Sequence, residues 1–165
     1  MKFIAEQTVL AEAAAWVAKG LPRRPAVPIL SHIKIEVAAG QIRLQAFDYD
    51  MSLSVAVEAD TGDSGTFLVP GHLLAAVLAT APHGPVSVDV DAAQAVLQAG
   101  KAVFTIPVGR VEDYPALPTM PDPDGELPAQ EFIQAVKQVA VAAGRRGAHD
   151  DLRGRRRIGA VGDEG

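Results

Sequence analysis

Strict two-residue alternation of apolar and polar side chains constrains the fold of this chain more than any other feature. The alternation runs over residues 33–37 and returns over 42–46 after the connection Ala39-Gly40. It continues over 51–57. A period of two places the apolar side chains on one face of a strand, and a short connection containing glycine is typical of a hairpin. These segments therefore predict an antiparallel sheet with one buried face.

Two other segments have the spacing of amphipathic helices. Over about 9–19 one apolar stripe forms, with Thr8 as the expected N-cap and Gly20 as the stop; its members are Leu10, Ala13, Ala14, Val17 and then Leu21. A second helix is expected over about 72–81, after Pro70 and Gly71. Its apolar side carries Leu73, Leu74, Val77, Leu78 and Ala81.

The remaining periodic segments complete the expected fold. A turn over 61–65 precedes a short strand that begins at 67–69, and three further strands follow the second helix over 86–90, 95–99 and 102–107. We expect the order β-α-β-β-β-α-β-β-β. This is an α+β arrangement in which two helices cover one face of antiparallel sheet.

Composition limits the class of protein. A hydrophobic content of 48% is enough for a core, and an aromatic content of only 5% makes that core mainly aliphatic. There is no apolar run of membrane-spanning length and no signal-peptide pattern at the N-terminus, so we expect a cytoplasmic protein without a membrane partner. The absence of cysteine excludes disulfides and thiolate metal sites. A net charge of −5 confines any nucleic-acid contact to local patches.

The chain changes character after about residue 120. A proline-rich stretch over 113–123 predicts an extended linker, and 128–143 is helical again. The apolar positions of this helix repeat those of the first helix at an offset of 122 residues, which indicates either a second copy of the domain or a chance similarity of alanine-rich helices. Residues 145–165 hold six of the 15 cationic and four of the 20 acidic side chains, a net +2 against −7 for 1–144, and predict a disordered basic tail.

Between the first helix and the first long strand, two arginines lie among three prolines. Pro22, Pro25 and Pro28 stiffen the segment that carries Arg23 and Arg24. A stiff pair of guanidinium groups loses little entropy on meeting phosphates. The alternative is that the prolines end a helix and the arginines only keep a turn in water.

Enzymatic interpretations have less support. Gly62-Asp63-Ser64-Gly65 matches the tetrapeptide around the nucleophile of trypsin-like proteases, but turn-forming residues between two strands are a commoner source of that string. Asp48 and Asp50 together could hold a cation, although such acids more often cap turns. The four histidines lack the spacing of metal ligands. We therefore expect no catalytic residue, metal or cofactor, and keep a small serine hydrolase around Ser64 as a remote alternative.

Several segments together resemble the N-terminal domain of the bacterial sliding clamp, the β subunit of DNA polymerase III. The similarity runs from Met1 to about Arg145 and rests on the order and spacing of the following pieces: Met1-Lys2-Phe3, Arg24-Pro25-Ala26-Val27-Pro28-Ile29-Leu30, Asp48 with Met51, Val69-Pro70, Phe104-Thr105-Ile106 and Glu112-Asp113-Tyr114-Pro115-Ala116-Leu117-Pro118. In that family two subunits of three similar domains close a ring around duplex DNA. The resemblance implies a non-catalytic processivity factor in DNA replication.

The resemblance also implies functional residues. Arg24 matches the family's DNA-contacting arginine, and Arg23 is expected to supplement it in weak binding of duplex DNA that is independent of base sequence. The family's subunit contact uses the second helix and the late edge strand. The matching positions here are Leu73, Lys101, Val103 and Ile106.

The chain departs from the family after its first domain. We expect 1–120 to form a clamp N-terminal domain, 121–144 a linker and the first helix of an incomplete second domain, and 145–165 an arginine-rich tail that looks like translation in another frame or a lineage-specific extension. The family's groove for polymerase and clamp-loader peptides would then be absent. We expect a monomer or a weak, open association, and hold open that the chain is an inert fragment or caps an intact clamp subunit.

Overall fold

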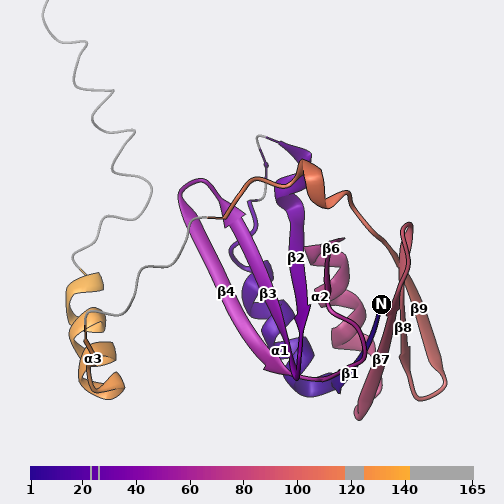
Figure 1. Ribbon diagram of the computed structural model, residues 1–165. Coiled ribbons are helices and arrows are strands. Elements are labelled where there is room, and N and C mark those ends of the chain that lie inside the picture. The colour runs from indigo at the N-terminus through magenta and orange to yellow at the C-terminus, as the bar shows by residue number, and fades with distance from the viewer. Residues whose placement is uncertain (23, 26, 118–124, 142–165) are drawn as a thin grey trace, which may run out of the picture. The chain divides into compact units, whose positions relative to one another are not determined.

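The computed structural model describes residues 1–22, 24–25, 27–117 and 125–141. The chain divides into two units, Met1–Thr119 and Met120–Gly165. The first contains every strand of the described chain and two α-helices (Figure 1). In the second, the described residues form one helix, α3 (Ala129–Ala140), and the residues next to it.

The strands of the first unit form two antiparallel sheets. One has the order β5-β1-β7-β8-β9, and the other has the order β4-β3-β2-β6. Their bounds are β1 (Lys2–Glu6), β2 (His32–Ala38), β3 (Gln41–Asp48), β4 (Met51–Glu58), β5 (Asp60–Thr61), β6 (Gly65–Pro70), β7 (Pro85–Val90), β8 (Gln94–Ala99) and β9 (Ala102–Pro107). The alternation in the sequence is matched by alternating burial, as in β2, where Ile33, Ile35 and Val37 are buried.

Two helices pack on each other and on the sheets. The first, α1 (Gln7–Ala18), contacts β3 and β4, whereas α2 (Gly71–Thr80) contacts β2, β6 and β9. Short 3₁₀ helices, η1 (Pro28–Ser31) and η2 (Val111–Asp113), precede β2 and follow β9. Both sheets therefore close over one helical pair, which is the α+β class expected.

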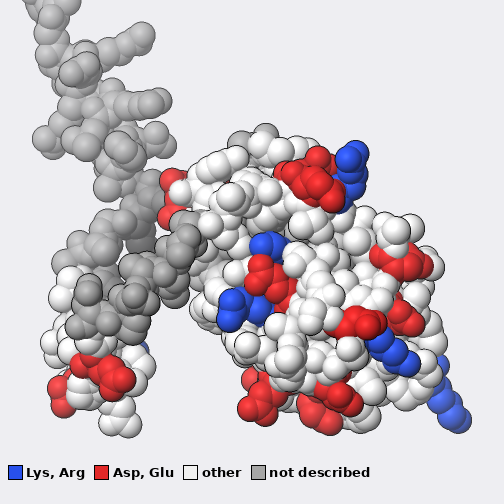
Figure 2. Space-filling model, in the orientation of Figure 1, with Lys and Arg blue, Asp and Glu red and all other residues white. Residues whose placement is uncertain are grey.

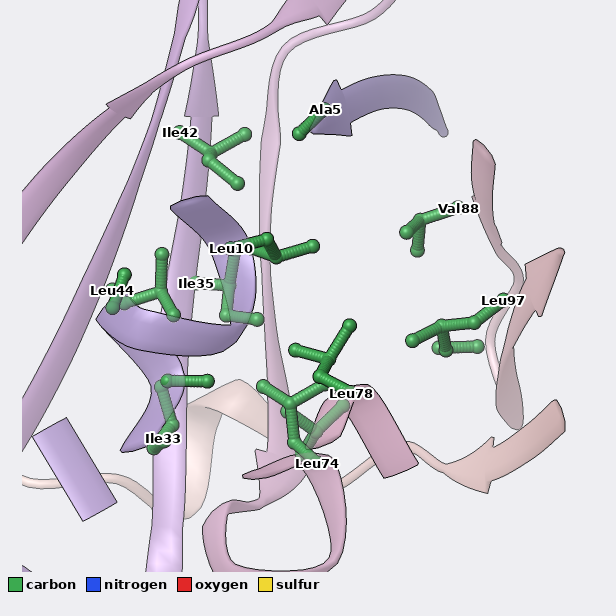
Figure 3. Close-up of a cluster of buried hydrophobic side chains, with 14 of the residues drawn as sticks. Ala5, Leu10, Ile33, Ile35, Ile42, Leu44, Leu74, Leu78, Val88 and Leu97 are labelled. Carbon is green, nitrogen blue, oxygen red and sulfur yellow. The ribbon is translucent and has the colours of Figure 1, made fainter. Parts of the chain in front are cut away.

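A single hydrophobic core joins the two helices and the two sheets (Figure 3). In the close-up, Leu10 of α1 and Leu74 and Leu78 of α2 point toward side chains from both sheets. Leu10, Leu78 and the strand residues Ile42 and Val88 are all buried. Burial of such aliphatic side chains contributes roughly 1.5–3 kcal/mol each before the entropy cost of folding.

The start of α1 is fixed by a buried glutamine rather than by the expected Thr8 cap. The helix begins at Gln7, and its N-cap residue Glu6 makes no side-chain cap. Gln7 is only 4% exposed; its Nε2 donates to the Leu78 carbonyl at 2.7 Å. His83 Nδ1 lies 2.9 Å from Gln7 Oε1 and is the donor, because an amide oxygen only accepts. The Thr8 prediction was wrong because this link places Thr8 inside the first turn.

The strand count between the helices differs from the expectation. Five strands, β2 to β6, separate α1 from α2, whereas the order β-α-β-β-β-α-β-β-β has three there. That order left out the short strand at 67–69, which is a full strand, and the two residues of β5, where only a turn was expected. A two-residue strand carries too little alternation to be seen in sequence.

The predicted apolar side of α2 is only partly buried. Leu74 and Leu78 lie in the core, but Leu73 is 41% exposed and Val77 is half-buried. The helix expected over 128–143 is observed as α3, and the expected stop at Gly144 and the tail 145–165 lie outside the described residues. No helix within the described residues is long and apolar enough to cross a membrane.

Candidate DNA-contact loop and exposed sheet edge

The loop that carries Arg24 is anchored at both ends by buried leucines. Leu21 follows the end of α1 and Leu30 lies in η1, and both side chains are buried. Gly20 lies so close to β4 that a Cβ at this position would overlap the side chain of Leu53. Arg24 lies between these anchors and is exposed. The described part of the loop therefore presents one guanidinium group, that of Arg24, while Arg23 lies outside the described residues.

Several basic groups of the strands that follow the loop add little net positive charge. At the end of η1, burial lowers the pKa of His32, so its imidazole is neutral at pH 7. On the neighbouring strands, Lys34 Nζ lies 2.7 Å and Arg43 Nη1 lies 4.0 Å from the carboxylate of Glu36. Figure 2 shows cationic and anionic side chains mixed on the face it presents. In the described part of the segment from Lys19 to Leu30, the exposed basic side chains are Lys19 and Arg24.

The second candidate site is the edge of the five-stranded sheet at β9. Val103 is 60% exposed, Lys101 is exposed in the β8–β9 turn, and Leu73 is exposed on α2, which contacts β9. Gly100 has φ 57°, a backbone conformation that glycine adopts without strain, and so allows the tight turn before Lys101. Three of the four predicted contact residues are therefore available to a partner.

The fourth predicted contact residue is placed differently. Ile106 is fully buried and belongs to the core. Ile106 lies two residues after Phe104 on β9, so both side chains point to the same face of the sheet, and Phe104 packs against the same core. Only the backbone of Ile106 can take part in an edge contact, because its side chain is already covered.

The catalytic and metal alternatives gain nothing from the structure. Ser64 lies in the turn between β5 and β6, and no side-chain hydrogen bond of the described residues joins its hydroxyl to a histidine. Asp48 and Asp50 flank Tyr49, whose φ is 24°, in the β3–β4 turn. The part of the chain that the structure describes holds no group of three or more potential metal ligands.

A further exposed surface was missed by the sequence analysis. Trp16, 46% exposed, and Val9 lie on the outward side of α1 beside the edge strand β4. The first helix has a broader apolar surface than the single stripe used to predict it. The sequence does contain a signal for this surface. Val9 and Trp16 lie outside the stripe, and Trp16 is the one aromatic residue of α1.

The comparisons with known proteins identify the family. The family model described as "DNA polymerase III beta subunit, N-terminal domain" matches residues 1–118. The chain belongs to this family.

Individual relatives agree with this assignment. The chain is 45% identical over 145 residues to the beta sliding clamp of Streptomyces coelicolor, and 37% identical over 145 residues to that of Micrococcus luteus. Each alignment covers 88% of this chain, and they cover 39% and 47% of the respective relatives.

Solved structures agree as well. The Caulobacter crescentus pol III beta structure is matched with a TM-score of 0.73 and 28% identity, covering 83% of this chain and 38% of that one. A beta subunit from Streptococcus pyogenes, at 21% identity and a TM-score of 0.74, shows the same fold. The chain thus has the fold of a sliding-clamp domain and spans about two fifths of the length of the Streptomyces coelicolor clamp.

Proposed function

We propose that this chain acts in DNA replication as a non-catalytic, DNA-binding domain of the sliding-clamp type. The observation that carries the proposal is the family match over 1–118 together with the exposed Arg24 on its anchored, proline-containing loop. The sliding-clamp family is a processivity factor without catalytic activity. Residues 1–120 would form the N-terminal clamp domain and α3 would begin a second one. With chromosomal DNA as its partner, the chain would act at the nucleoid in the cytoplasm.

Binding to duplex DNA should be weak and independent of base sequence. Arg24, supplemented by Arg23, would contact phosphates, and such contacts carry no base information. Few other basic side chains lie at the ends of the two helices of the first unit: Lys19 follows α1 and His72 is the second residue of α2. Each phosphate neutralised by a cation contributes to the salt dependence of binding, so the affinity should fall steeply with salt.

The test is fluorescence anisotropy of a labelled duplex over a series of salt concentrations. Arg24→Ala should weaken binding and reduce the slope of log K against log salt by about 1, and Arg23→Ala should add to the loss. Arg43→Ala, the same change at a cation 4.0 Å from the carboxylate of Glu36, is the matched control and should change little. Deleting 145–165 measures the separate share of the tail arginines. Undiminished binding by the tail-less chain without both loop arginines would refute the assignment.

A second candidate function is to cap an intact clamp subunit. The exposed Leu73, Lys101 and Val103 at the β9 edge favour it, because this is the surface that the family resemblance assigns to subunit contact. Mixing the chain with an intact clamp from the same cell and measuring molar mass by light scattering tests it. A complex that Val103→Asp abolishes supports capping. If no complex forms, capping is refuted and only the proposed DNA-binding function is left.

A further inference from the structure

A largely apolar groove lies between the outward side of α1 and the edge strand β4. It consists of two adjoining hollows of about 840 Å³ and about 530 Å³, which share Val9, Ala56 and Val57. The larger hollow continues toward Ile4 of β1, and the smaller one toward Trp16. Volumes of this size are typical of ligand sites. The groove therefore has room for several side chains of a partner.

The apolar side chains of this groove are only partly covered by the chain itself. Trp16 is 46% exposed, Val9 is 49% exposed and Ile4 is 38% exposed. Trp16 is also the single tryptophan of the chain. A tryptophan that a partner can cover is among the side chains that most often dominate the binding energy of an interface. The groove thus offers an apolar side chain of a partner a surface on which to be buried.

Acidic side chains border the groove. Glu6, Glu58 and Asp60 line the larger hollow, and Glu12 lines the smaller one. All four carboxylates are exposed, and no ion pair of the described residues involves any of them. Lys19 is the one cationic side chain among the described residues that line either hollow. Electrostatic complementarity therefore favours a basic partner.

The acids and the tryptophan lie at different ends of the groove. Val9 lines the same hollow as Glu58 and Asp60, and Trp16 follows it by seven residues on α1. Seven residues of helix extend about 10 Å along the axis. An extended peptide covers that distance in about three residues. A fitting partner therefore carries its cations about three residues away from a bulky apolar side chain.

We propose that this groove binds a short basic segment of another protein. A bulky apolar side chain of the segment packs against Trp16, and Lys or Arg side chains about three residues away pair with Glu58 and Asp60. The apolar contact supplies most of the affinity, and the charged contacts fix the direction of the segment. The site goes beyond the proposed function, because it requires neither DNA nor Arg24, and a loss of DNA binding would leave it intact.

Titration of the full chain with the peptide Lys-Lys-Ser-Gly-Ser-Phe, blocked at both ends, tests the proposal. Because Trp16 is the single tryptophan, its fluorescence reports on the groove directly. The emission should shift to shorter wavelength and saturate at peptide concentrations up to about 1 mM, the range of weak binding. Replacing both peptide lysines by glutamate, or the phenylalanine by serine, should weaken binding about tenfold or more.

A charge reversal in the chain tests the direction of the segment. Glu58→Lys should weaken binding of the lysine peptide about three- to tenfold, because it replaces an attraction by a repulsion. The same variant should bind the glutamate peptide more tightly than the wild-type chain does. Glu112→Lys is the matched control: it makes the same change in η2, which contacts β6 at the opposite edge of the sheet from β4. This control should bind the lysine peptide as the wild-type chain does.

Three results would overturn the proposal: no change in the Trp16 emission, equal binding of the lysine and glutamate peptides, or a Glu112→Lys variant as impaired as Glu58→Lys. The titration also identifies a different occupant. If the emission of Trp16 shifts with protein concentration in the absence of peptide, a second copy of the chain covers the groove, which contradicts a basic segment of another protein.

Discussion

The helices α1 and α3 have the same apolar spacing and opposite burial. In α1, Leu10 and Val17 are buried, whereas the positions 122 residues later, Phe132 and Val139, are 54% and 71% exposed. The first helix has two sheets to cover, and α3 has no buried residue. An amphipathic pattern therefore specifies which face a helix can bury, but the sheet that covers it decides whether the face is buried.

Amide exchange should show the largest difference between the two helices. The core amides of α1 should exchange only through global unfolding, with an opening free energy of about 5–15 kcal/mol for a domain of this kind. Those of α3 should exchange nearly as fast as a free peptide, because an isolated helix of 12 residues is marginal. Equal protection in both helices, measured by mass spectrometry, would contradict the conclusion that α3 lacks a covering sheet.

Truncation of an apolar side chain should have the next largest difference in effect between α1 and α3. Leu10→Ala should lower the free energy of unfolding by about 2–5 kcal/mol, because it leaves a cavity between the helices and the sheets. Val139→Ala should leave it within about 0.5 kcal/mol, as at other exposed positions. Denaturant melts followed by the fluorescence of Trp16, the single tryptophan, measure both. A neutral Leu10→Ala would contradict the helix-on-sheet core.

Glycine substitutions test how closely the two units are packed around their glycines. A Cβ at Gly71, at the start of α2, would overlap Leu21 and come within 2.8 Å of Ile33 Cγ1. Gly71→Ala should therefore cost about 1–3 kcal/mol by overpacking. Gly125→Ala, where nothing lies within 4 Å, is the control and should be neutral or slightly stabilising. Equal melting midpoints would show that the Gly71 site relaxes without cost.

The smallest expected effect is a pH dependence confined to the first unit. Burial lowers the pKa of His32 below its ordinary value of 6.5, so the unfolded chain binds this proton before the folded chain does. Titration of His32 leaves the free energy of unfolding unchanged above about pH 6.5. Below that value the free energy of unfolding falls until the pH reaches the lower pKa of His32 in the folded chain. His32→Gln should flatten part of this fall in urea melts, and an unchanged fall would contradict the role of His32.

The candidate sites differ in how far the sequence could predict them. The exposure of Arg24 follows from its place among prolines, since a stiff polar connection must run over the surface. The residues predicted for the β9 edge differ in exposure, and their role in a subunit contact stays a prediction. Val103 and Lys101 are exposed, but Ile106 has the same residue type and strand as a contact residue and is buried, because alternation turns it toward the core.

The strand alternation and the two helices of the first unit could be predicted from the sequence, because they depend on local periodicity. The family could be predicted as well, because its motifs keep their order and spacing along the chain. Three further points depend on the folded arrangement. It divided the strands between two sheets, it replaced the expected Thr8 cap by the buried Gln7 link to Leu78 and His83, and it left β4 and β9 as exposed edges. The physical reason is common to all three: each depends on which distant segments become neighbours, and a periodic pattern carries no information about its partner.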